Sequence, residues 1–258
     1  MTEYLVVCLT ALVASGLSLF SGFGLGTILM PVFAIFFRLE VAIASAALVH
    51  LCNNLFKLVL LGRHADKGTV ARFGIPAAFA ALLGAWCLVR LADFQSLYEY
   101  TLAGRTHFVT PVKLVVALLM VFFALFELMP SLEKISFRRK YLPLGGLLSG
   151  FFGGLSGHQG AMRSAFLIKC GLTKESFIST GVLIACLVDL TRILGYGPYL
   201  SRVLDTGNTP LLGAAVLSAF LGAFIGNRLL KKVTMQAVQL LVSIMLFLIA
   251  AGLAAGLI

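Results

Sequence analysis

Long apolar segments follow one another along the whole chain, and polar residues gather mainly in the short stretches between them. Most of these segments are close to the roughly 20 residues that a helix needs to cross a bilayer. The apolar elements are 4–21, 24–37, 42–61, 72–91, 109–130, 142–157, 160–170, 176–195, 210–229 and 235–257. This pattern predicts an all-α polytopic membrane protein rather than a soluble domain.

Two glycine-rich stretches interrupt the apolar pattern. Residues 15–31 read SGLSLFSGFGLGTILMP, and residues 149–165 read SGFFGGLSGHQGAMRSA. Glycine weakens a helix, and paired interruptions in two halves of a transporter are a sequence sign of its binding site. We therefore expect the two stretches to form one functional site.

The two halves of the chain are related by a shift of 134 residues. The matched residues are Gly16 with Gly150, Gly26 with Gly160, Ser45 with Ser179 and Pro76 with Pro210. With four more residues inserted, Gly84 and Ala85 match Gly222 and Ala223, and Arg90 matches Arg228. The matches occur in order, which indicates internal duplication. We expect an N-terminal membrane repeat over 1–133, a cytoplasmic basic linker over 134–140 and a C-terminal membrane repeat over 141–258.

The distribution of Lys and Arg distinguishes two topologies. If each glycine element crosses the membrane once, the loops on the two sides hold nine Lys or Arg each, and no orientation is favoured. If each is a hairpin that turns back, twelve lie on one side and six on the other, as the positive-inside rule expects. The chain is therefore predicted to contain two inverted repeats, each a glycine-rich re-entrant hairpin plus three transmembrane helices. In this topology both termini lie on the outer side of the membrane.

Composition agrees with a membrane protein. Charged residues make up 12% of the chain, against roughly 25% in soluble domains. The net charge of +10 is spread over short loops, so it encodes orientation and we expect no nucleic-acid partner. The five cysteines form no CxxC motif, and we expect neither a disulfide nor a metal site. The first segment opens with Glu3 and lacks a small-residue cleavage site, which indicates a mature helix rather than a signal peptide.

Four polar residues stand on the third apolar element: His50, Asn53, Asn54 and Lys57. Their spacing places them on one face of a helix. Polar groups in apolar segments are costly and mark functional sites by default, so this face should meet a cavity. The alternative is hydrogen bonding to a partner helix, and Lys57 could also extend toward the cytoplasm.

The corresponding helix of the second half carries Asp189 and Arg192. One interpretation is an internal ion pair at i,i+3. The other assigns Asp189 and Arg192 to the outer approach of a pathway, with Asn53, Asn54 and Lys57 on the cytoplasmic approach. From their distances to the helix ends, the levels of Asp189 and Lys57 differ by roughly 13 Å, which argues against a direct bond.

The second glycine stretch also holds His158, Gln159 and Arg163. If a short helix begins after the break, its free N–H groups and dipole favour an anion, and Arg163 adds a permanent positive charge. In the first stretch, Gly22, Gly24 and Gly26 would let backbone N–H groups approach a ligand. The alternative for these glycines is tight packing of helices.

These residues carry a family resemblance. The run GFGLGTILMP at 22–31 resembles the first motif of the TauE/SafE family of sulfite exporters and related permeases. VAIAS at 41–45 looks like the family's alanine-rich helix opening, and LLGA at 82–85 like its LLGA segment. FLGAFIGNR at 220–228 is similar to the LGAxxGxR stretch of the second half. The resemblance spans nearly the whole chain, and the order of its motifs is more specific than any motif alone.

The resemblance implies transport of small sulfur oxyanions or organosulfonates, such as sulfite, across the bacterial inner membrane. The second glycine stretch departs from the family's pattern, since Gly157-His158-Gln159-Gly160 is followed by Arg163 and by Ala165 in place of the closing proline. Because the ligand would bind there, the substrate stays open, although added positive or protonatable groups are compatible with an anion.

We therefore expect a secondary transporter of a small anion, with a midplane site between two glycine hairpins. Its partners are the anionic substrate and the lipid bilayer, and a homo-oligomer is compatible with the sequence. GxxxxGK[ST], HExxH and GxSxG motifs are absent, so we expect no ATP site, no catalytic residues and no cofactor. Alternatives are a cation or proton-coupled carrier of another small solute, and a non-transporting assembly subunit. Proton coupling through His50, His158 or Asp189 is a further hypothesis.

Overall fold

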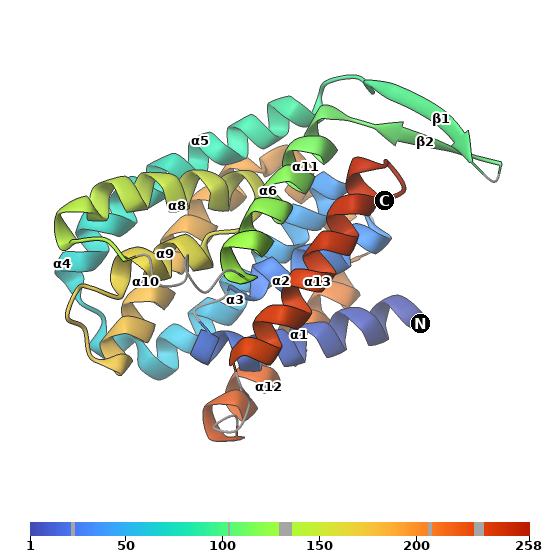
Figure 1. The fold of residues 1–258 in the computed structure, drawn as a ribbon. Helices are drawn as coiled ribbons and strands as arrows, with labels where there is room; N and C mark the ends of the chain where they lie inside the picture. The colour runs from blue at the N-terminus through green and yellow to red at the C-terminus, as the bar shows by residue number, and fades with distance from the viewer. Residues whose placement is uncertain (22–23, 103, 129–135, 206–207, 230–234) are drawn as a thin grey trace.

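The computed structural model describes residues 1–21, 24–102, 104–128, 136–205, 208–229 and 235–258, and nearly all of them are helical (Figure 1). Within these ranges, four helices are long and apolar enough to cross a membrane: Leu39–Leu60, Lys67–Ala92, Lys174–Gly195 and Thr209–Gly226. The shorter apolar helices are Thr2–Ser18, Leu25–Phe36, Pro111–Phe126 and Gln239–Ala254. The fold is that of a polytopic α-helical membrane protein.

The elements follow the predicted order closely. The first half contains α1 (Thr2–Ser21), α2 (Leu25–Phe36), α3 (Leu39–Leu61), η1 (Gly62–His64), α4 (Lys67–Thr69), η2 (Val70–Gly74), α5 (Ile75–Ala92), β1 (Tyr98–Leu102), β2 (Arg105–Val109) and α6 (Pro111–Leu128). The second half contains η3 (Arg139–Tyr141), α8 (Leu142–Ser156), α9 (Gly160–Leu167), α10 (Lys174–Gly195), α11 (Gly197–Asp205), α12 (Thr209–Leu229) and α13 (Met235–Ala254). Each of the ten predicted apolar elements corresponds to a helix, which confirms the helical assignment.

Apart from the three-residue helices η1, α4 and η3, two features lie outside the predicted set. The first is an antiparallel hairpin that pairs Tyr98 with Val109 and Leu102 with Arg105. It extends beyond the helices, and Gly104 near its tip has φ +76° (Figure 1). The second is α11, a short helix whose polar residues keep it below the apolar threshold. Both fall in stretches that the hydropathy pattern leaves as loops.

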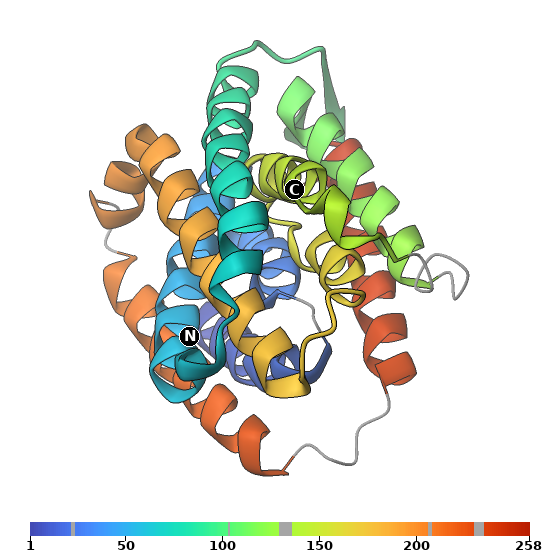
Figure 2. The same ribbon diagram turned by 90° about the vertical axis from the view of Figure 1, so that its left-hand side faces the viewer.

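Helices from the two halves of the sequence pack against each other. α1 packs along α12, α5 along α8, and α3 against α10. Figure 2 shows α5 beside α10, and α6 beside α13 on the opposite flank. A Cβ added at Gly150 of α8 would collide with the Ala77 carbonyl of α5, and one added at Gly222 of α12 with the Leu12 carbonyl of α1. Small residues at these crossings let the helix backbones touch.

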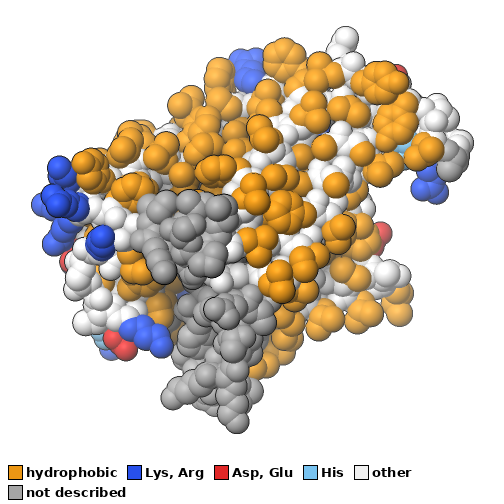
Figure 3. Space-filling view, viewed as in Figure 1, with side chains coloured by type: hydrophobic (Ala, Val, Ile, Leu, Met, Phe, Trp, Pro, Cys, Tyr) orange, Lys and Arg blue, Asp and Glu red, His pale blue; other side chains and the backbone are white. Residues whose placement is uncertain are grey.

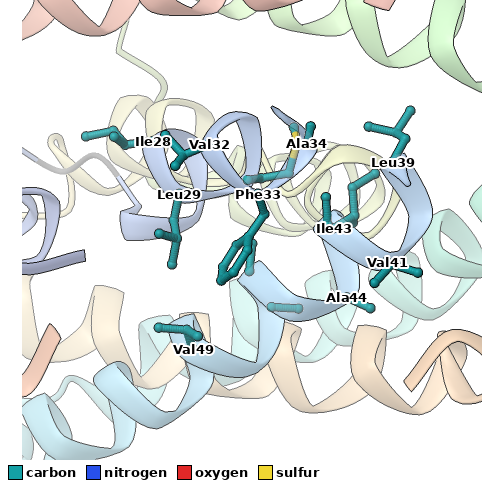
Figure 4. Close-up of a cluster of buried hydrophobic side chains, with 14 of the residues drawn as sticks. Ile28, Leu29, Val32, Phe33, Ala34, Leu39, Val41, Ile43, Ala44 and Val49 are labelled. Carbon is teal, nitrogen blue, oxygen red and sulfur yellow. The ribbon is translucent and has the colours of Figure 1, made fainter. Parts of the chain in front are cut away.

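The core encloses the second helix. All residues from Leu25 to Ala34 of α2 are buried. Figure 4 shows its apolar side chains with those of the start of α3, and Phe33 points from α2 toward the middle of α3. The N-terminus of α2 is therefore surrounded by protein, which is what an interrupted helix needs in a membrane.

The surface separates apolar from charged residues. Hydrophobic side chains cover the long flank of the molecule, whereas Lys and Arg gather at the end that holds α4 (Figure 3). We call this the basic end, and its exposed residues include Arg63, Lys67, Arg72, Arg138, Arg139 and Lys140. Of the predicted basic linker, residues 134–135 lie outside the described part of the chain.

Candidate functional site

Both glycine stretches break a helix, as the sequence predicts. In the first, α1 ends at Ser21, and Gly24 caps α2 in an extended conformation (φ −79°, ψ 138°). In the second, α8 ends at Ser156 and is capped by Gly157, whose φ of +82° strongly favours glycine, and α9 begins at Gly160. Gly22 lies outside the described residues.

The fold brings the two breaks together. A Cβ built on Gly26 would lie 3.7 Å from the Gly157 carbonyl oxygen. The same position lies 3.8 Å from an Arg192 guanidinium nitrogen and 3.8 Å from the His50 ring. The start of α2, the break after α8, the middle of α3 and the last turns of α10 therefore meet at one point inside the protein.

Asp189 of α10 organises this meeting point. Its side chain is 0% exposed. Oδ2 lies 2.6 Å from His50 Nδ1 and accepts a hydrogen bond from Asn54 Nδ2 at 3.1 Å. Oδ1 accepts from Gln159 Nε2 at 3.1 Å and from Arg192 Nε at 3.0 Å. Both carboxylate oxygens are thus occupied by donors from three separate elements.

Arg192 links this cluster to the second break. It forms the predicted i,i+3 ion pair, with Nη2 2.8 Å from Asp189 Oδ1. Its Nη1 donates to the Gly153 carbonyl at 3.2 Å, and the Tyr196 hydroxyl donates to the Gly154 carbonyl. These carbonyls lie near the C-terminal end of α8, where the helix dipole favours a cation, and the Gly153 carbonyl also accepts from the Gly157 N–H at 3.0 Å. Arg192 therefore holds the end of α8.

Lys57 and Asn53 lie one turn away, against α1. Lys57 Nζ donates to Ser18 Oγ at 2.7 Å, with the Ser15 carbonyl at 3.5 Å. The Asn53 amide fits its surroundings best when its oxygen accepts from Lys57 Nζ (3.1 Å) and its nitrogen donates to Ala219 O (3.3 Å). The ammonium group is thus surrounded by neutral oxygens. Among the described residues, no carboxylate forms an ion pair with Lys57.

A cavity of about 120 Å³ lies beside these groups. Its polar lining comes from five elements: Ser18, Gly24, His50, Asn54, Lys57, Arg163, Ser164 and Lys174. Lys174 is exposed and begins α10, so the cavity reaches the surface there. Arg163 is only 8% exposed, and its one side-chain hydrogen bond among the described residues goes to Gln159 Oε1 at 3.4 Å. No acidic residue is among the cavity's described lining residues.

The predicted site residues thus form two groups, one that lines the cavity and one that lies behind it. Gly24, Asn54, Lys57, Arg163 and His50 line the cavity, and Gly26, Asn53, Gln159, Asp189 and Arg192 support them. His158 lies apart. Its ring stacks on Phe123 of α6 (5.4 Å between centroids), and its Nδ1 donates to the Ser156 carbonyl at 3.0 Å. Asn54 donates to Asp189, so the polar residues of α3 and α10 are in contact inside the protein.

Sequence reasoning missed three contributors. Ser18 accepts from Lys57, Lys174 lines the cavity mouth, and Tyr196 bonds the end of α8. Ser18 lies within the first glycine stretch, which is the only sequence signal for it. Lys174 was counted only as a basic loop residue, and nothing in the sequence distinguishes Tyr196.

Comparison with known families identifies the chain. The family model described as Sulfite exporter TauE/SafE matches residues 7–253. The chain belongs to the TauE/SafE sulfite exporter family. TauE/SafE proteins are membrane transporters of sulfur-type anions and not enzymes. This TauE/SafE protein is therefore a multi-pass membrane transporter whose partners are a small anion and membrane lipids. A search of curated proteins finds no match.

Proposed function

We propose that this TauE/SafE protein carries a small anion across the inner membrane through the cavity between the two helix breaks. The anion is a sulfur oxyanion such as sulfite, or an organosulfonate. The observation that carries the proposal is the composition of the cavity wall: Lys57, Arg163 and Lys174 line it, and no Asp or Glu is among its described lining residues. About 120 Å³ leaves room for a few water molecules or one small anion.

The geometry of the first break supports anion binding as well. Gly24 lines the cavity and caps α2, a helix of 12 residues. The free N–H groups and the dipole at such an N-terminus attract negative charge. Arg163 on α9 and Lys57 on α3 then contribute the opposite walls, and the planar Arg163 guanidinium suits a bidentate contact with an oxyanion. In this arrangement Gln159 and Asn54 orient the binding groups.

The helix pairing supports two inverted repeats, 1–133 and 141–258, joined by the linker 134–140. The shift of 134 residues relates α1 to α8 and α5 to α12, so a two-fold axis would exchange the α1–α12 and α5–α8 pairs. Such an axis would pass between α3 and α10, the pair at the polar cluster. This midplane position is where inverted-repeat transporters bind their substrates.

Helix lengths support re-entrant hairpins at both breaks. α2 has 12 residues and α9 has 8, or about 18 and 12 Å of helix, against about 30 Å of hydrocarbon. Both chain termini lie away from the end that holds α4 (Figure 1). With the basic end in the cytoplasm, both termini are outside. The cavity mouth at Lys174 then faces the cytoplasm.

The rival cation carrier finds less support. It would need free acidic oxygens, yet both oxygens of Asp189 are occupied by His50, Asn54, Gln159 and Arg192. Anion flux into liposomes distinguishes a carrier from a non-transporting assembly subunit.

Thermal stabilisation of the detergent-purified protein tests the proposal. Sulfite, sulfate, thiosulfate, taurine and a small alkylsulfonate are compared with a carboxylate control. A specific ligand should stabilise the fold by about 2.7 kcal/mol at about a hundredfold excess over its Kd. Arg163→Ala should abolish the shift, whereas Lys169→Ala, an exposed basic residue outside the cavity lining, should retain it. Anion flux in liposomes containing only this chain then separates a carrier from an assembly subunit. No shift with any sulfur anion would contradict the proposal.

A further inference from the structure

We infer that His50 binds the proton that travels with the anion, so that this protein is an anion–proton symporter. The inference rests on the proposed function and concerns the same cavity. Three groups are candidates for the proton-binding site: His50, His158 and Asp189. The inference selects His50, and it states that the proton and the anion move in the same direction.

The two ring nitrogens of His50 face different partners. Nδ1 lies 2.6 Å from Asp189 Oδ2. An ionised carboxylate only accepts hydrogen bonds, so Nδ1 carries the hydrogen. Nε2 faces the first helix break, since a Cβ added at Gly24 would lie 3.2 Å from it. His50 also lines the cavity. Protonation therefore occurs at the nitrogen that faces the N-terminus of α2.

The two protonation states act oppositely on an anion. Neutral His50 presents a lone pair at Nε2, which repels the negative charge of an anion. Protonated His50 presents an N–H donor and a positive charge beside the proposed anion site. An anion thus binds the protonated form more tightly, and by linkage its binding increases the proton affinity of His50 by the same factor.

The charges around His50 make this coupling conditional. Asp189 and Arg192 face it from α10 and compensate each other. Lys57 faces it from α3, and Arg163 faces the shared cavity from α9. Neither cation forms an ion pair with a carboxylate in the described part of the chain, and the positive charge of Lys57 opposes protonation of His50 when the cavity is empty. An anion between them removes that opposition, and the proton and anion enter together.

The other two candidates lack this arrangement. Asp189 is held ionised by its four donor side chains. His158 is not among the described lining residues of the cavity, and its Nδ1 donates to a backbone carbonyl rather than to a carboxylate. Of the three candidates, His50 is the one that contacts Asp189 and also lines the cavity among the described residues.

The test measures binding of a small alkylsulfonate, which stays fully ionised, from about pH 5 to about pH 8, the range in which a histidine titrates. The wild-type Kd should fall by up to about tenfold for each unit of pH decrease while free His50 is mostly neutral. His50→Gln should lose the part of this dependence that His50 carries, so its pH slope should be clearly shallower than that of the wild type. His64→Gln, which alters an exposed histidine, should keep the wild-type slope. Melting temperatures in the absence of anion verify that both variants fold.

A second measurement does not depend on any variant. Adding the alkylsulfonate to wild-type protein in weakly buffered solution should take up about one proton per anion bound. Binding without proton uptake, or an unchanged pH slope in His50→Gln, would overturn the coupling and leave the anion site intact. Absence of binding at every pH would instead refute the proposed function.

Discussion

Replacing Arg192 by Met tests whether the buried arginine is structural. The guanidinium is 1% exposed, and it provides the ion pair of Asp189 and a donor to the Gly153 carbonyl. Removing one partner leaves a buried carboxylate uncompensated, which costs about 3–5 kcal/mol. Met keeps the length and helix propensity of the side chain, so the loss reports the charge rather than a cavity. We expect the free energy of unfolding of the anion-free protein to fall by about this amount.

The matched control is Arg163→Met. Arg163 is also buried, but its only side-chain hydrogen bond in the described chain is a long one to Gln159, and no acid pairs with it. Its removal should change the unfolding free energy by no more than about 1 kcal/mol. Denaturation in detergent, with and without the alkylsulfonate, measures both variants. The double variant Asp189→Asn with Arg192→Met should recover part of the loss, since the two sites are coupled. Equal destabilisation by the two Met variants, or a neutral Arg192→Met, would refute this division of roles.

Three further predictions concern the two breaks and the basic end. Gly24→Ala places a methyl group 3.2 Å from His50 Nε2, so titration calorimetry should show weaker anion binding with little change in melting temperature. Gly157→Ala forces a φ of +82° on an L-residue, which should cost about 1–2 kcal/mol of stability in denaturation. Asp66 caps α4 by accepting from Thr69 N at 2.7 Å, and Asp66→Ala should cost about 1 kcal/mol at neutral pH. The hydrogen bond from Thr69 holds the pKa of the Asp66 carboxyl below its usual value, so this contribution is present at neutral pH. It should disappear as the pH falls through that lowered pKa, and acid melting curves of the wild type and variant should then converge.

The helices were predictable from sequence because apolar length dominates in a membrane. The missed hairpin carries its own signal, since Tyr98, Tyr100 and Leu102 alternate with other residues as a strand requires. Hydropathy averaged over the length of a membrane span does not register an alternation with a period of two residues. α11 was missed for the same reason, because nine residues with a polar side give no apolar run.

The members of the site were largely predictable, but their pairing was not. His50, Asn54, Asp189 and Arg192 were found because polar groups inside apolar helices are costly. Which of them touch depends on the relative height of α3 and α10, and the sequence gives no direct measure of it. The positions of Asp189 and Lys57 relative to their helix ends predict no direct bond between them, and the two residues form no ion pair in the described part of the chain. The same estimate did not foresee that Asn54, one turn from Lys57, donates to Asp189.

The contrast between satisfied and unsatisfied charges locates the function. Both carboxylate oxygens of Asp189 accept hydrogen bonds inside the protein, and Arg192 pairs with Asp189 and donates to the Gly153 carbonyl, so these two residues stabilise the meeting of the two breaks. Lys57 and Arg163 are buried without a described acidic partner, an arrangement that opposes folding. A sequence selected only for stability would replace them with apolar residues. Their position on the wall of a cavity that reaches the surface gives a reason for keeping them, because in the proposed function the transported anion would supply the missing negative charge.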